Sequence, residues 1–179
     1  MQADMSGQKN NIGKAYIQVT QTLRMWEPKI FLHFSYSGGL GVTEPKQYSY
    51  YIVNTFAAGA AYNIQWKGFW LSNVLDYKYV PYTRSTHDLL YTLYWWKGLY
   101  NYKVEFAGDF SIWTENKNHG DDDTKDMHGK RFSFFDEPQL WYNVSNRWAV
   151  GTKINMFYHV NTTDNIFQVF PTIAIKYKL

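Results

Sequence analysis

The chain has 179 residues, which suits one domain, and 20% of them are aromatic (8 Trp, 16 Tyr and 12 Phe). The net charge of +3 is too balanced for a nucleic-acid-binding surface, and the lack of cysteine excludes disulfides and thiolate metal sites. The longest apolar run, residues 56–62, is far shorter than the ~20 residues that a membrane-spanning helix needs.

From residue 14 onward, nine segments of about 10–15 residues alternate apolar and polar side chains, which is the pattern of β-strands. They cover residues 14–25, 28–38, 49–63, 67–80, 86–97, 100–115, 130–144, 147–160 and 165–179. In the second segment, Leu32 and Phe34 fall on the opposite face from His33, because successive side chains of a strand point to opposite sides. Strands of this length favour a membrane wall, since strands in soluble proteins average ~5–6 residues.

The connections between these segments alternate between short and long. The short ones lie around 25–28, 63–67, 97–100 and 144–147, and the longer or more polar ones are 6–13, 38–48, 80–86, 115–130 and 160–165. Membrane barrels have tight turns on the periplasmic side, longer loops outside, and normally an even number of strands. We therefore expect at least one further strand upstream, with residues 2–5 as its tail. Residues 1–5 lack the basic start and the apolar stretch of a signal peptide, so the chain is mature, truncated at its start or cytosolic. The strand count favours missing N-terminal sequence, with a signal peptide and at least one strand in it.

The last segment has one apolar and one polar face. Ile173, Ile175 and Tyr177 lie on the first, and Lys176 and Lys178 lie on the second. An aromatic residue two positions before an apolar end resembles the terminal signal of bacterial outer-membrane barrels. This pattern predicts a sheet with its apolar face toward lipid and its polar face toward an interior.

Four pieces carry a resemblance to a known family. They are Tyr36–Gly39, Lys130–Phe132, Glu137–Asn143 and Val150–Lys153, in that order along the chain. Together they resemble the nucleoside-specific outer-membrane channel (Tsx-like) family, in its branch from Bacteroidota, over about residues 13–179. The resemblance implies a monomeric barrel of about twelve strands with a narrow pore, and nucleosides as its cargo.

If the apolar faces meet lipid, the polar faces line a lumen. The pore-lining and solute-binding candidates on these faces are Gln18, Arg24, His33, Lys103, Glu105, Asp109, Trp113, Arg131, Glu137, Gln139, Trp141, Lys153, Asn155, Phe157 and His159. Aromatic rings among them offer surfaces for a nucleobase, and the polar groups offer hydrogen bonds for a sugar. The alternative is a plugged barrel in which the interior charges simply neutralise one another.

Two other groups of residues suggest different chemistry. In the loop 115–130, Asp121, Asp123 and Asp126 are weak candidates for a hard cation, but the spacing is not that of an EF-hand. We expect a solvated, mobile external loop and neither a metal nor a cofactor. His87 lies beside Ser85 and Asp88, which is the arrangement nearest to an activated nucleophile, as a lipid-modifying barrel enzyme would need.

The sequence therefore predicts one all-β domain over residues 1–179. It is an antiparallel up-and-down transmembrane barrel with nine strands visible, about ten to twelve when complete, in the outer membrane of a Gram-negative bacterium. The predicted function is that of a porin-like channel for passive diffusion of small polar solutes, with nucleosides as hypothesised cargo, and not that of an enzyme. Its expected partners are outer-membrane lipid, the solute and other outer-membrane proteins, and not nucleic acid. The alternatives are a non-conducting subunit or scaffold of a larger complex, a lipid-modifying enzyme, and a soluble ligand-binding barrel with inverted faces.

Overall fold

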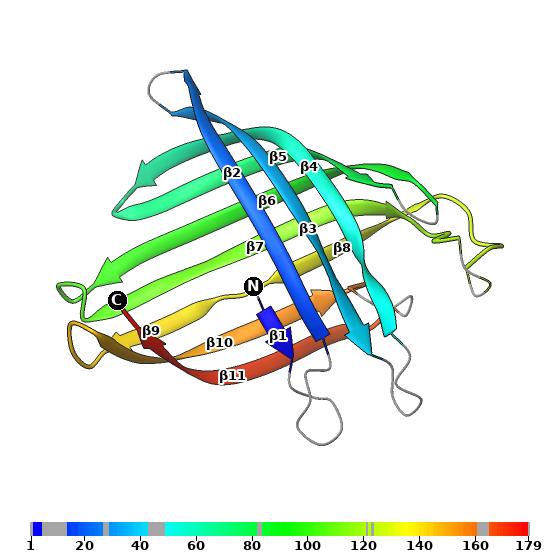
Figure 1. The fold of residues 1–179 in the computed structure, drawn as a ribbon. Helices are drawn as coiled ribbons and strands as arrows, with labels where there is room; N and C mark the ends of the chain where they lie inside the picture. Colours follow the sequence, from blue (N-terminus) through cyan, green and yellow to red (C-terminus); the bar gives the residue numbers. More distant parts are fainter. Residues whose placement is uncertain are drawn as a thin grey trace.

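The computed structural model describes residues 2–4, 14–26, 29–42, 49–81, 84–120, 122, 124–160 and 165–178. These residues form one antiparallel sheet (Figure 1). Its strands are β1 (Gln2–Asp4), β2 (Lys14–Trp26), β3 (Ile30–Val42), β4 (Ser49–Trp66), β5 (Phe69–Val80), β6 (Thr86–Leu99), β7 (Val104–Asn116), β8 (Lys130–Asp136), β9 (Gln139–Asn143), β10 (Trp148–Tyr158) and β11 (Phe167–Tyr177). In this described part, no helix is long and apolar enough to cross a membrane.

Strands that follow one another in the chain also lie side by side in the sheet. β8 and β9 are two halves of one strand, because both pair with β7 and β10 and keep the same register against them. The interruption falls at Glu137 and Pro138, where proline lacks the amide hydrogen that a ladder requires. The sheet thus has ten up-and-down positions, and the predicted all-β antiparallel topology is confirmed.

The sheet curves strongly but does not close into a barrel. Among the described residues, β11 pairs only with β10, and the outer edge of β2 pairs with β1 only over Lys14–Tyr16. Figure 1 shows the resulting trough, with the opening between β2 and β11. The segment expected to be the tail of an upstream strand, residues 2–5, contains β1, which pairs with β2. The open sheet is consistent with a β-barrel, but it does not show the closed barrel that the sequence predicts.

Of the predicted short connections, those after 97 and at 144–147 correspond to turns, and the one predicted at 63–67 falls at 67–68 because β4 runs to Trp66. The one at 25–28 includes residues 27 and 28, which lie outside the described residues. Lys67 and Gly68, both with positive φ (48° and 79°), form the tight two-residue turn between β4 and β5. Tyr100, Asn101 and Tyr102 also have positive φ (50°, 54° and 63°). The strand predicted from residue 100 therefore begins only at Val104, after this turn.

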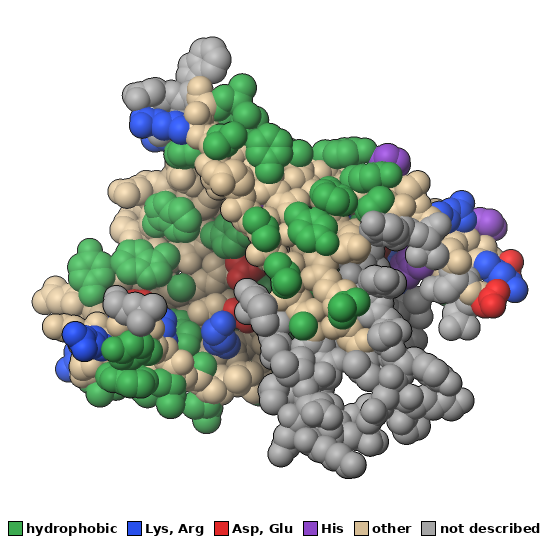
Figure 2. All heavy atoms as spheres, in the orientation of Figure 1, with side chains coloured by type: hydrophobic (Ala, Val, Ile, Leu, Met, Phe, Trp, Pro, Cys, Tyr) green, Lys and Arg blue, Asp and Glu red, His purple; other side chains and the backbone are tan. Residues whose placement is uncertain are grey.

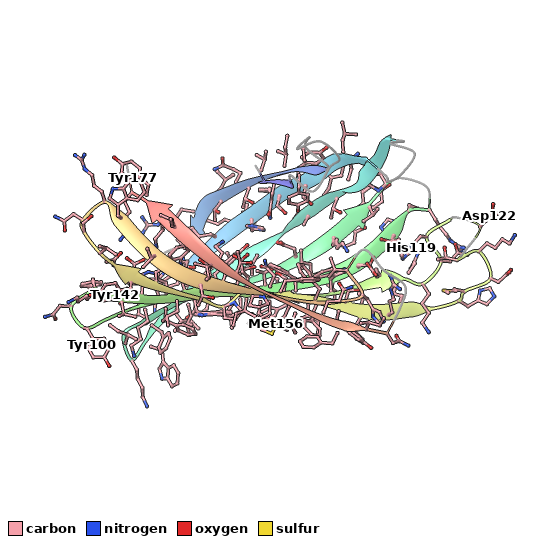
Figure 3. The ribbon with its side chains drawn as sticks, turned by 90° about the horizontal axis from the view of Figure 1, so that it is seen from below. Tyr100, His119, Asp122, Tyr142, Met156 and Tyr177 are labelled. Carbon is pink, nitrogen blue, oxygen red and sulfur yellow. The ribbon has the colours of Figure 1, made fainter. Side chains whose placement is uncertain are left out.

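The curvature separates a convex from a concave face. Phe34, Ala58 and Tyr77 pair across β3, β4 and β5 on the convex face. His33, Gly59 and Asp76 pair across the same strands on the concave face. Figure 3 shows the trough from below, with Met156 of β10 on its convex side.

The two faces have inverted polarity relative to a water-soluble sheet. On the convex face, Ile173 is 90% exposed and Ile175 is 70% exposed. The charged strand residues that are buried, Asp76, Lys78, Asp88 and Glu105 among them, lie on the concave face. Five hydrophobic side chains are buried among the described residues, and all five are concave: Ala57, Ala61, Val74, Trp141 and Ala149. Figure 2 shows hydrophobic side chains spread over the outer surface, acidic and basic ones visible in the hollow, and further charged ones at the ends of the molecule.

Candidate functional site on the concave face

A histidine and a carboxylate meet on one wall of the trough. His33 Nδ1 on β3 donates to Asp76 on β5, at 2.8 Å from Oδ2 and 3.0 Å from Oδ1. Gly59 on β4 lies between them in register. A Cβ atom at Gly59 would stand 2.0 Å from the Leu75 carbonyl oxygen and 2.6 Å from Asp76 Oδ1. The absence of a side chain at residue 59 is therefore what lets β3 and β5 interact across β4.

A second cluster surrounds Glu105 near the turn-side end. Lys176 Nζ donates to Glu105 Oε2 at 2.8 Å, and Lys178 Nζ donates to Oε1 at 2.7 Å. Asn143 Nδ2 donates to the same Oε1 at 2.8 Å. Both lysines come from the C-terminal end of the chain, so this carboxylate ties β7 to β11 across the intervening strands.

Trp141 connects this cluster to the middle of the face. Its ring lies 4.7 Å from Lys176 Nζ, and its Nε1 donates to Gln139 Oε1 at 2.9 Å. Gly151 on β10 leaves the space for this ring, since a Cβ there would lie 2.7 Å from it. Gln139 in turn donates to Glu137, which also accepts from Lys153 Nζ at 2.9 Å.

A third cluster lies toward the loop-side end. Glu115 accepts hydrogen bonds from Arg131 Nε at 2.8 Å, Ser133 Oγ at 2.9 Å and Trp113 Nε1 at 3.2 Å. Lys78 Nζ stands 5.0 Å from the centre of the Trp113 ring. Asp88 accepts from Thr114 Oγ1 at 2.9 Å and from Lys130 Nζ at 2.5 Å.

The loop after β7 is folded against this cluster. Asn118 and Thr124 are buried, and the backbone amide of His119 donates to Thr124 Oγ1 at 2.9 Å. Arg131 donates to His119 Nε2 at 3.3 Å. Figure 3 shows His119 close to the strand ends and Asp122 at the outer tip. The expectation of a solvated loop is wrong at Asn118 and Thr124, which are buried within the loop's own hydrogen bonds.

The proposed cation ligands lie partly outside the described residues. Asp121 and Asp123 lie outside the described residues. Asp126 is described, and its side chain is exposed. Within the part of the chain that the structure describes, no three His, Asp or Glu side chains converge as metal ligands would.

Most of the predicted pore-lining residues share the concave face. By strand alternation and register these are Gln18, Arg24, His33, Glu105, Asp109, Trp113, Arg131, Glu137, Gln139, Trp141, Lys153, Asn155 and Phe157. Lys103 and His159 lie in connections instead, because β7 starts at Val104 and β10 ends at Tyr158. The Lys103 ammonium stands 5.6 Å from the Tyr142 ring, and His159 Nδ1 donates to the Phe132 carbonyl at 2.7 Å.

The residues suggested as an enzyme site point apart. His87 is on the convex face, where its Nδ1 bonds the Tyr77 hydroxyl. Asp88 is on the concave face and is bound to Lys130. Consecutive strand residues necessarily face opposite sides, so these two cannot act on one substrate group.

Sequence reasoning missed several concave residues, among them Lys78, Glu115 and Tyr94. The signal was present, since Lys78 follows Asp76 and Glu115 follows Trp113 at the two-residue period of a strand.

The whole chain, residues 1–179, matches a protein family described as a domain of unknown function (DUF5020). The chain belongs to this DUF5020 family. No curated protein and no solved structure matches it. For this DUF5020 member, therefore, the concave face itself is the basis for any functional argument.

Proposed function

We propose that this DUF5020 protein is an outer-membrane β-barrel wall whose convex face contacts lipid. The inverted polarity of the two faces is the observation that carries the proposal. Exposing apolar surface to water costs about 25 cal/mol per Å², and side chains such as Ile173 and Ile175 are largely exposed. Lipid removes that cost, and a spanning sheet needs its polar groups on the other side.

We further propose that the concave face lines a passive path for small polar solutes. Its carboxylates are mostly neutralised within the wall, as at Glu105, Glu115 and Glu137. A lining of paired charges exerts a weak field on ions, and its hydrogen-bonding groups remain able to contact an uncharged solute. Together with the resemblance to nucleoside channels, this makes nucleosides the proposed cargo.

One observation favours a second candidate, a non-conducting barrel that serves as a subunit of a larger complex. The same ion pairs, together with the buried ring of Trp141, fill part of the trough with side chains. A lumen filled in this way would hold the wall rigid without passing solute.

Single-channel recording separates the two candidates. The full-length protein, purified in detergent, is added to a planar lipid bilayer in KCl, and uridine is then added. Discrete conductance steps that uridine reduces support the path. A protein with the far-ultraviolet circular dichroism of a folded sheet that inserts but gives no steps supports the scaffold instead. Stable solubility without detergent would overturn the membrane assignment itself.

A further inference from the structure

Asp109 differs from the other carboxylates of the concave face. Those at Asp76, Asp88, Glu105, Glu115 and Glu137 each bond a basic side chain directly. Asp109, on β7, is half-buried, and its carboxylate bonds no basic group among the described residues. Its own backbone carbonyl is occupied by the amide of Glu137, at 2.8 Å. Among these six carboxylates of the concave face, Asp109 is thus the one that no basic side chain of the described residues bonds.

One tyrosine and two tryptophans lie on the same face, on the two strands that precede β7. Tyr94 on β6 pairs directly with Asp109, and Trp96 follows two residues later on the same face. Trp96 pairs in turn with Trp70 on β5, which is 39% exposed. By strand alternation Trp70 lies on the concave face, and its partial exposure leaves ring surface free for a ligand. We call Trp70, Tyr94, Trp96 and Asp109 the central patch.

These groups fit a solute of one chemical kind. An ionised carboxylate has only acceptors, and its two oxygens can receive two adjacent hydroxyl groups together. An exposed indole stacks with a flat ring. Tyr94 and Asp109 lie on adjacent strands, about 5 Å apart, whereas Trp70 lies two strands and one concave position away from Asp109, about 12 Å in all. Side chains that reach toward each other across this distance leave room for a small ring joined to a vicinal diol.

We propose that the central patch is the solute-recognition position of the path, where Asp109 binds vicinal hydroxyls and Trp70 stacks with the attached ring. This rests on the proposed function, because it requires that the concave face be open to solute. Asp109 and Trp70 are then the residues that determine specificity.

The test compares uridine with 2′,3′-dideoxyuridine, which lacks the two vicinal hydroxyls but keeps the 5′-hydroxyl, as blockers of single-channel current in KCl. For the unmodified protein we expect uridine to give half-block at a concentration about tenfold lower than the dideoxy analogue does. Hydrogen bonds to a charged group discriminate between two ligands by at least that factor. In Asp109→Asn the two blockers should differ by less than about twofold, while Asp109→Glu should keep the preference. Trp70→Leu should weaken both blockers about equally, by roughly tenfold.

The matched control is Asp122→Asn, which removes a fully exposed loop carboxylate and should leave both blockers unchanged. If Asp109→Asn still prefers uridine, or if the unmodified channel does not distinguish the two compounds, the inference is wrong while the path stands. If Asp109→Asn does not fold, Asp109→Ser makes the same comparison. A folded, inserted protein without current overturns the path, and the inference with it.

Discussion

The His33–Asp76 pair should couple β3 to β5 energetically. Asp76 is 2% exposed and His33 is 7% exposed, so removing one partner leaves the other buried and unpaired. For His33→Ala the stranded carboxylate should cost about 3–5 kcal/mol of unfolding free energy. For Asp76→Ala the buried imidazole loses its hydrogen-bond acceptor, and we expect about 1–3 kcal/mol. The double variant has no unpaired charge, so its cost should fall short of the sum by at least about 1.5 kcal/mol.

The assay is urea unfolding of the protein in lipid vesicles, followed by tryptophan fluorescence, for the two single variants and the double variant. Lys125 and Asp122 provide the control cycle, because their side chains are 3.6 Å apart and largely exposed. Exposed pairs of this kind couple by less than about 1 kcal/mol. If the unfolding free-energy losses of the His33 and Asp76 variants add within about 0.5 kcal/mol, the pair does not couple the two strands. The argument that Gly59 lets β3 and β5 interact across β4 would then be wrong.

Three further substitutions test other parts of the structure. Ile173→Lys should cost about 2–4 kcal/mol of folding free energy in lipid vesicles if the convex face meets hydrocarbon. Thr172→Lys on the concave face should cost much less, and equal costs would contradict the assignment of the convex face to lipid. Gly151→Ala should lower the urea-unfolding free energy by about 1–3 kcal/mol, since the new Cβ would lie 2.3 Å from the Leu140 carbonyl oxygen, and a change near zero would argue against close packing there. Thr124→Val removes the acceptor of the His119 amide, so limited proteolysis within 117–129 should become several-fold faster; unchanged protection would mean that the loop is held by other contacts.

The strands could be predicted from the sequence because alternation is a local property. Eight of the nine predicted segments correspond to one strand each, and the segment 130–144 corresponds to β8 and β9. Pro138 is the sequence signal for that interruption, since proline cannot donate a backbone hydrogen bond to a neighbouring strand. The sequence also predicts that the side chains of His87 and Asp88 point to opposite faces, because the two residues are consecutive in one strand.

The contacts of the concave face could not be predicted in this way. Glu105 and Lys176 are 71 residues apart and on strands that are not neighbours, so their meeting depends on how sharply the sheet curves. The roles of Gly59 and Gly151 depend on which rings and carboxylates lie beside them, which only the register decides. The order of the loop after β7 rests on two buried polar side chains, Asn118 and Thr124, that composition alone marks as solvent-exposed.

The interruption between β8 and β9 is a point at which the sheet can bend. Ile154 donates its amide to the Pro138 carbonyl at 3.1 Å, but proline has no hydrogen to return to the Ile154 carbonyl. One rung of the ladder is thus missing, while the rungs on either side keep their register. The two halves can tilt against each other at this point without turning any side chain to the wrong face. Bending of the sheet should therefore concentrate beside Asp109 and Glu137, and amide hydrogen exchange should be fastest there among the central strands.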